Sequence, residues 1–149
     1  MDYGQRGYSG RQWQRETRAP SRSEWGRVMP SRIVVVHDEA DFLAQAVLAL
    51  RRAGREVVDF TDPSTALAAF RNWQTVELLI TPVFFRPGTL NGASLAFMVK
   101  MKQPKLKVIF IAPPEYSKDY LRFGEFLPSP ISIPNLMAIV ERSLPSLHP

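Results

Sequence analysis

The chain has 149 residues, no cysteine and a net charge of +5. This length suits one ordinary domain, which can bury its core without a disulfide or a structural metal. The lack of cysteine excludes disulfides, cysteine zinc sites and thiol catalysis, and no apolar run is long enough to span a membrane. We therefore expect a cytoplasmic protein without a membrane partner.

The first 30 residues differ from the rest in composition. They are rich in Gly, Ser, Gln, Arg and Pro, and no strand-like or helix-like apolar repeat runs through them. Residues 1–32 hold seven arginines and three acidic residues, so they carry +4 of the net charge of +5. We expect residues 1–30 to form a disordered basic tail. Because its arginines alternate with tyrosines and tryptophans, weak nucleic-acid binding by this tail is an alternative role.

Regular structure is predicted from residue 31 onwards. Ile33–Val36 is a short β-branched run, typical of a buried parallel strand. The residues after it, Asp38–Ala53, have apolar side chains at helical spacing and predict a helix. Glu56–Phe60 predicts the second strand. Asp62 and Pro63 predict the start of the next helix, because an aspartate cap followed by proline favours a helix N-terminus.

The second half repeats this alternation of strand and helix. In chain order it predicts the strand Glu77–Ile80, a loop over residues 81–92, the helix Ala93–Lys102, the strand Lys107–Ala112, a short helix within Glu115–Phe123, the strand Glu125–Leu127 and a helix from Ser132 to Leu144. Leu95, Met98 and Val99 form the predicted apolar face of the third helix. Right-handed connections then predict a three-layer α/β/α sandwich around a five-stranded parallel sheet. The predicted domain covers residues 31–145, with a short C-terminal tail over 146–149.

Four blocks of this domain resemble the receiver domain (CheY-like) of response regulators in two-component signalling. The blocks are Arg32–Glu39, ending in His-Asp-Glu, Leu78–Gly88 with its Pro-Gly loop, Val108–Ala112 and Phe126–Ile131. Their order and spacing match those of the family. The resemblance implies a flavodoxin-like fold of the receiver type. It also implies a phosphorylation site at the carboxyl ends of the strands.

The departures from the family lie at the positions that carry its chemistry. The family's site positions fall on His37, Asp38 and Glu39 (acidic pocket), Thr81 (phosphoacceptor aspartate), Ile111 (switch hydroxyl), and Ser129 and Pro130 (lysine–proline pair). Phosphoryl transfer to a receiver needs an attacking carboxylate, carboxylates that hold Mg²⁺, and a cation facing the developing charge. We therefore predict a degenerate pseudo-receiver that is not phosphorylated on aspartate, with no catalytic residue, cofactor or resident metal.

Smaller expectations concern the side chains around this site. Adjacent residues at a strand end cannot all face one ion, so His37 is expected to be a polar residue at the sheet edge and not a metal ligand. Asp38 and Asp41 are candidate caps of the first helix. Of the two consecutive rings Phe84 and Phe85, one is expected to be exposed.

The predicted function is a stand-alone pseudo-receiver that acts by protein–protein interaction in bacterial two-component or phosphorelay signalling. It is not predicted to be an enzyme, because no nucleophile and base pair is evident. The expected partner is a sensor kinase, another receiver or a regulatory protein, with a homodimer as an alternative. The interface candidates are Tyr116, Tyr120, Phe123 and Phe126, although these rings could instead cover the sheet. Two other functions stay open: a phosphorylatable single-domain regulator with a rearranged site, and a nucleic-acid-associated protein.

Overall fold

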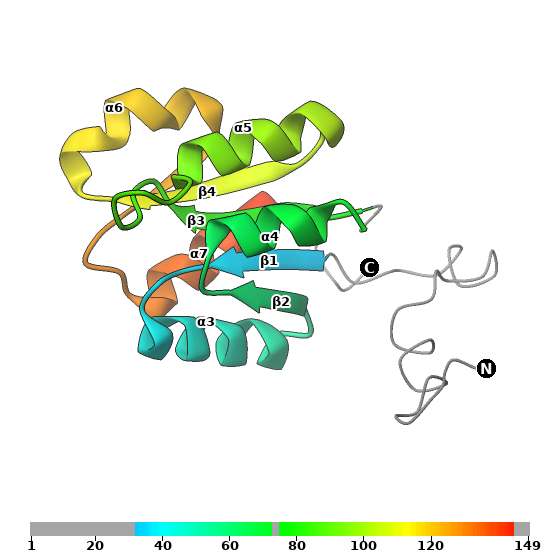
Figure 1. Cartoon of the computed structure of the whole chain (residues 1–149). Coiled ribbons are helices and arrows are strands. Elements are labelled where there is room, and N and C mark those ends of the chain that lie inside the picture. Colours follow the sequence, from blue (N-terminus) through cyan, green and yellow to red (C-terminus); the bar gives the residue numbers. More distant parts are fainter. Residues whose placement is uncertain (1–31, 73–74, 145–149) are drawn as a thin grey trace, which may run out of the picture.

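A computed structural model describes residues 32–72 and 75–144 of the protein (Figure 1). The predicted tails over residues 1–30 and 146–149 lie outside these ranges. Within them, strands and helices alternate as predicted. None of the helices in these two ranges is both long and apolar enough to cross a membrane.

The strands are β1 (Arg32–Val36), β2 (Glu56–Phe60), β3 (Leu78–Pro82), β4 (Lys107–Ala112) and β5 (Glu125–Pro128). The helices are α3 (Ala40–Arg52), α4 (Pro63–Phe70), α5 (Gly92–Lys102), α6 (Ser117–Tyr120) and α7 (Ile133–Ser143), with the 3₁₀ turns η1 (Pro114–Tyr116) and η2 (Leu121–Phe123) on either side of α6. The strand order is β2-β1-β3-β4-β5 and every pair is parallel. This order is the flavodoxin-like one, which confirms the predicted fold class.

Both faces of the sheet are covered by helices, as Figure 1 shows. Alternate side chains of a strand point to opposite faces. Ile33 and Val35 therefore pack into a core with α3 and α7, whereas Val34 and Val36 pack into a second core with α4 and α5. Because both faces of the central strands β1, β3 and β4 are covered, these strands need apolar residues at nearly every position, which explains their unbroken apolar runs.

Two details of the helices differ from the sequence prediction. α3 begins at Ala40, and its N-cap residue Glu39 makes no side-chain hydrogen bond, so the prediction that Asp38 or Asp41 caps this helix was wrong. The chain at Glu39 is still extended, since its N–H is bonded to His37. In α5, Met98 was predicted to be buried, but Ala96 occupies the sheet-facing side and Met98 points outward.

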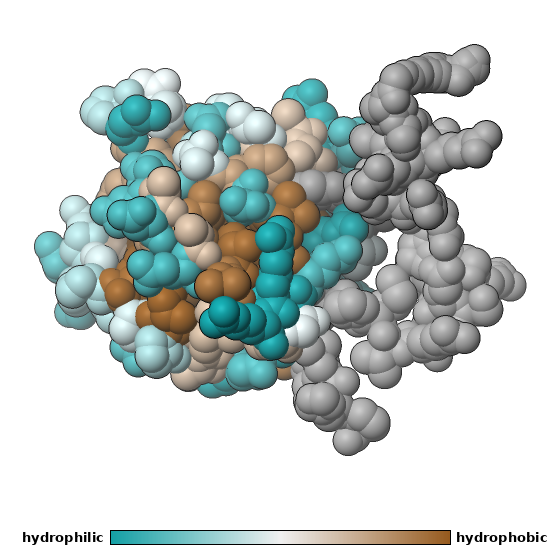
Figure 2. All heavy atoms as spheres, turned by 90° about the horizontal axis from the view of Figure 1, so that it is seen from below, coloured by the Kyte–Doolittle hydropathy of each residue, from teal (hydrophilic) through white to brown (hydrophobic). Residues whose placement is uncertain are grey.

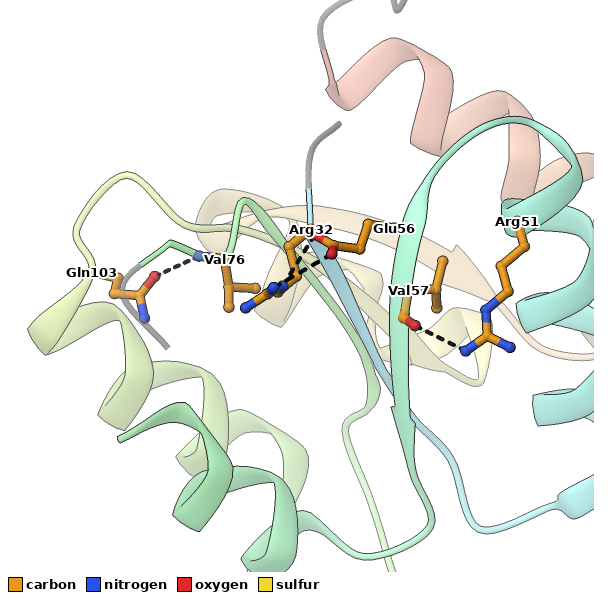
Figure 3. Close-up of polar contacts among 6 residues, drawn as sticks. All are labelled: Arg32, Arg51, Glu56, Val57, Val76 and Gln103. Carbon is orange, nitrogen blue, oxygen red and sulfur yellow. Dashed lines mark hydrogen bonds and ion pairs between the residues drawn. The ribbon is translucent and has the colours of Figure 1, made fainter. Parts of the chain in front are cut away.

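At the amino ends of the strands, polar groups are paired (Figure 3). Arg32 of β1 lies 3.3 Å from the carboxylate of Glu56 in β2. Just before β3, the Val76 N–H donates to the side-chain oxygen of Gln103 over 3.0 Å. These contacts tie neighbouring strands and the end of α5 together where the chain enters the sheet.

The β2 edge of the sheet is protected by a cation. Arg51 of α3 donates a 3.1 Å hydrogen bond to the Val57 carbonyl of this strand (Figure 3). Figure 2 views the molecule from the side of α3 and β2, where hydrophilic side chains cross an apolar area. Charged side chains over an edge strand discourage pairing with another chain.

Candidate functional site

A pocket of about 840 Å³ opens at the carboxyl ends of the strands. Ligands of open α/β sheets bind at this end. The residues that line the pocket from the ends of β1, β3, β4 and β5 are His37, Pro82, Ile111, Ala112 and Ser129. The pocket thus brings together chain segments that are far apart in sequence.

Apart from His37, every ionisable residue that lines this pocket is acidic. Asp38, Glu39 and Asp41 contribute three carboxylates, and no lysine or arginine is among the lining residues. A phosphate group in the pocket would meet this negative charge without a compensating cation. The electrostatics therefore oppose an anionic ligand.

Prolines weaken the pocket further as an anion site. Four of the lining residues are Pro82, Pro113, Pro130 and Pro134. Proline has no backbone N–H, so these positions cannot donate hydrogen bonds to phosphate oxygens. The remaining walls include Phe42 and Ile111, so the pocket suits an apolar or cationic group better than a phosphate.

His37 is buried, and its burial favours the neutral form of the ring. Its Nδ1 accepts a 3.0 Å hydrogen bond from the Glu39 N–H, and its ring lies 4.6 Å from that of Phe42. Burial lowers the pKa of His37 below 6.5, while the nearby Asp38 and Glu39 carboxylates oppose this only in part. Because Nδ1 accepts a hydrogen bond, its 3.5 Å approach to Asp38 is not an ion pair in the neutral form.

The residues of this pocket do not fit a Mg²⁺ ion. Mg²⁺ prefers several oxygen ligands, usually with carboxylates among them. At the strand ends, His37 directs Nδ1 to the Glu39 backbone and Pro82 offers no side-chain oxygen. Across residues 32–72 and 75–144, no group of three or more His, Asp or Glu side chains is arranged to share a metal ion.

Thr81 does not reach the pocket, although the sequence placed the phosphoacceptor position there. It is fully buried, and its hydroxyl donates to the Pro82 carbonyl over 3.0 Å. A Cβ added at Gly92 would lie 2.7 Å from its Oγ1, so Thr81 faces the start of α5. Pro82, one residue later, lines the pocket instead. The alternation of side chains along β3 was the signal that could have identified Pro82.

The other predicted site residues do come together. Ile111, Ser129 and Pro130 all line the pocket, and so does Ala112, the last residue of β4, which was not among the predicted site residues. The Ser129 N–H donates to the Ala112 carbonyl over 2.9 Å, which extends the β4–β5 pairing to the pocket. Here the pocket offers the neutral hydroxyls of Ser129 and Ser132 and the apolar residues Ile111 and Ala112 at the end of β4.

The four aromatic interface candidates do not form one exposed patch. Phe126 is buried in the core beneath α4 and α5, so its prediction as an interface residue was wrong. Tyr116 and Tyr120 are half-buried and pack against the same core, since residues after β4 turn back over the sheet. Phe123 is exposed.

The expectation for the two consecutive phenylalanines after β3 was confirmed. Phe84 is exposed at the pocket and its ring lies 4.9 Å from that of Tyr116. Phe85 is half-buried and packs against the core beneath α4 and α5. Tyr116 thus contacts a loop of the pocket and does not stand apart as a separate surface.

Comparison with known proteins gives matches among solved structures only. No family model and no curated protein matches the chain. The receiver domain of the hybrid histidine kinase CckA is 31% identical, with a TM-score of 0.64, and the match covers 77% of this chain and 100% of that domain. The receiver domain of NtrX from Brucella abortus is 27% identical, with a TM-score of 0.66, over 75% of this chain and 97% of that domain.

A longer NtrX structure from Brucella abortus gives a similar match. It is 27% identical with a TM-score of 0.68, and the match covers 78% of this chain but only 27% of NtrX. The likeness therefore concerns the receiver part of that protein. Together with the strand order and the pocket at the carboxyl ends, these matches show that the chain belongs to the receiver-domain family of response regulators, the signalling modules of two-component systems.

Proposed function

We propose that the protein is a degenerate receiver that is not phosphorylated on aspartate and signals by binding another protein. The observation that carries this proposal is the composition of the carboxyl-end pocket. Pro82 stands at the end of β3, Ala112 at the end of β4 and Ser129 just after β5. None of these residues is a carboxylate or a cation.

Phosphoryl transfer to a side chain requires groups that this pocket lacks. A nucleophilic carboxylate must attack, and positive charge must stabilise the transferred group. Pro82 provides no nucleophile, and Ser129 provides a hydroxyl in place of a cation. The carboxylates present, Asp38 and Glu39, would repel the phosphoryl donor without a metal ion between them.

Thr81 does not replace the missing nucleophile. Its hydroxyl is inaccessible, and it is already bonded to the Pro82 carbonyl. A hydroxyl of ordinary basicity also needs a neighbouring base to become a nucleophile. The Pro82 carbonyl and Gly92 at the start of α5 lie beside this hydroxyl, and neither is a base that could activate it.

Without a reaction in the pocket, the signal depends on contacts of the folded surface. A ligand or partner changes the state of a protein only if it binds one conformation more tightly than another. We propose that a protein partner does this here and takes the place of phosphorylation.

The test is incubation of the wild-type chain with radiolabelled acetyl phosphate and Mg²⁺. We expect no label on the wild type. A rebuilt variant, His37→Asp/Pro82→Asp/Ala112→Thr/Ser129→Lys, is expected to gain an acid-labile label. Its threonine replaces Ala112 and not Ile111, because Ala112 is the last residue of β4 and lines the pocket. In the matched variant, Thr81→Asp replaces Pro82→Asp, and this protein is expected to stay unlabelled because residue 81 faces α5.

Circular dichroism of all three proteins controls for folding. An acid-labile label on the folded wild type would overturn the proposal. Labelling of the Thr81→Asp variant and not of the Pro82→Asp variant would show that the site position was assigned to the wrong residue.

A further inference from the structure

Helix α5 is apolar on the side that faces solvent as well as on the side that faces the sheet. Leu95, Ala96 and Val99 are buried against the sheet. On the outer side, Phe97 is 43%, Met98 44% and Met101 83% exposed. A helix that is apolar all round normally has a partner on each side. In the described part of the chain, no element buries Phe97, Met98 and Met101 as the sheet buries the inner side of α5.

Two grooves flank the exposed residues of α5. One, of about 370 Å³, lies between α5 and η2 and is lined by Phe97, Met101 and Phe123. The Phe97 and Phe123 rings meet edge to face at 5.2 Å, which fixes the relation of the two elements. The other groove, of about 360 Å³, lies between α4 and α5 and is lined by Leu67, Met98 and Met101. Met101 borders both.

The charged residues of both grooves are cations. Lys100 and Arg122 line the groove beside η2, Arg71 and Lys102 line the groove beside α4, and neither groove has an acidic lining residue. The Lys100 ammonium donates to the Leu106 carbonyl over 2.9 Å, which leaves two of its three donors for another group. This surface therefore has the opposite charge to the carboxyl-end pocket.

We propose that these two grooves bind an acidic amphipathic helix of a partner protein. We call them the α5 surface, defined by Phe97, Met98, Met101 and Phe123 with the four cations named above. Large apolar side chains of the partner enter the grooves on either side of Met101, and its carboxylates face the cations. The inference rests on the proposed function, in that it identifies the class of partner for a receiver that acts by binding.

The chemistry of the surface favours this occupant over others. The α5 surface is formed by helices and a 3₁₀ turn, so it offers no strand edge to which a partner strand could pair. A second copy of the chain joined by a two-fold axis would bring the same four cations together. Methionine and phenylalanine in grooves are typical of surfaces that accept amphipathic helices.

The experiment selects ligands from a display library of helical peptides of about 18 residues, long enough for several turns. Selection uses the full-length wild-type protein alone, and Met101→Glu is kept as the test variant for the binding measurements. Leu48→Glu is the matched control, because Leu48 is 51% exposed on α3, away from the α5 surface. Fluorescence anisotropy then measures the affinity of the enriched peptides.

We expect enriched peptides with acidic residues and apolar residues three or four positions apart. Met101→Glu should weaken their binding roughly tenfold or more, as at an interface hot spot. Leu48→Glu should leave binding unchanged, and added salt should weaken it.

Three results would overturn the inference. They are a selection that enriches no peptide, peptides that bind Met101→Glu as tightly as wild type, and enriched peptides that are basic. The same variants tested with an oligonucleotide, with phosphatidylglycerol vesicles and by analytical ultracentrifugation cover other occupants. The inference would also be overturned if no acidic peptide were enriched and Met101→Glu abolished binding to either probe or abolished dimerisation.

The acetyl phosphate experiment separates this inference from the proposed function. Labelled wild type that still binds acidic peptides at the α5 surface would overturn only the proposed function. Unlabelled wild type that binds no acidic peptide would overturn only the inference.

Discussion

The two ends of the same sheet differ in how their polar groups are used. At the amino ends, opposite charges are paired: Arg32 with Glu56, and Arg142 with Glu125 at the start of β5. At the carboxyl ends, acidic residues line a pocket that contains no lysine or arginine. The amino end therefore has the contacts that hold strands and helices together. The carboxyl end has the shape of a ligand site without the groups that phosphoryl chemistry needs.

The largest expected effect on the free energy of unfolding comes from substituting two glycines, one at each end of the sheet. A Cβ at Gly92 would lie 1.6 Å from the Pro82 carbonyl oxygen, beside the pocket. At Gly124, before β5, it would lie 2.4 Å from the Val108 carbonyl oxygen. We expect Gly92→Ala to lower the free energy of unfolding by about 3 kcal/mol, and Gly124→Ala by about 2 kcal/mol, because in both cases the backbone must shift.

Urea denaturation of the two glycine variants and the wild type measures these differences. A Gly92→Ala protein with an unchanged midpoint would show that the junction of β3 and α5 is less tightly packed than described. In that case Thr81 could turn toward the pocket, and the distinction from Pro82 would fail.

A smaller effect is expected from pH, and only at the carboxyl end. Burial lowers the pKa of His37 below its ordinary value of 6.5, so the unfolded chain takes up a proton more readily than the folded one. The contribution of His37 to the stability is therefore fully present above pH 6.5 and is lost as the pH decreases from there through the lower pKa of the folded state. His37→Asn keeps a hydrogen-bond acceptor for the Glu39 N–H but does not titrate in this range.

Unfolding free energies of the wild type and His37→Asn, measured at about pH 7.5 and about pH 5.5, isolate this contribution because histidine titrates between them. The wild type is expected to lose more stability than the variant on acidification. Equal losses would mean that His37 is accessible to solvent, so that its ring could face a ligand.

The smallest effect is expected at the amino end. Arg32 and Glu56 are only partly buried, so their ion pair is expected to contribute about 0.5 kcal/mol. A double-mutant cycle with Arg32→Gln and Glu56→Gln measures this coupling. A coupling above about 2 kcal/mol would be too large for a partly exposed pair and would show that the amino end is a more strongly coupled network than described.

The sequence predicted the strands well because both faces of the sheet are buried. β2 and β4 have the bounds predicted from the sequence, Glu56–Phe60 and Lys107–Ala112, and in β4 every residue after Lys107 is apolar and buried. The structure differs from the sequence prediction at the end of β3, where Thr81 lies in the core and does not line the pocket. A threonine can lie in a core when its hydroxyl is bonded locally, as here to Pro82.

The α5 surface could not be predicted from the sequence. The apolar residues of α5 occur all around the helix, so their spacing does not show which side faces the sheet. That Phe123 packs beside Phe97 depends on where the chain places η2 after β4, which is a tertiary contact. The sequence predicts a group of aromatic residues after β4, but it does not separate exposed Phe123 from buried Phe126.

The most direct test of the central claim uses beryllofluoride, a mimic of the phosphoryl group, with Mg²⁺. Backbone amide shifts are followed by NMR during a titration of the full-length wild type. We predict no saturable shifts at His37, Ala112 or Ser129, and saturable shifts at these positions in the rebuilt His37→Asp/Pro82→Asp/Ala112→Thr/Ser129→Lys variant. Saturable, Mg²⁺-dependent shifts around the pocket of the wild type would contradict the account.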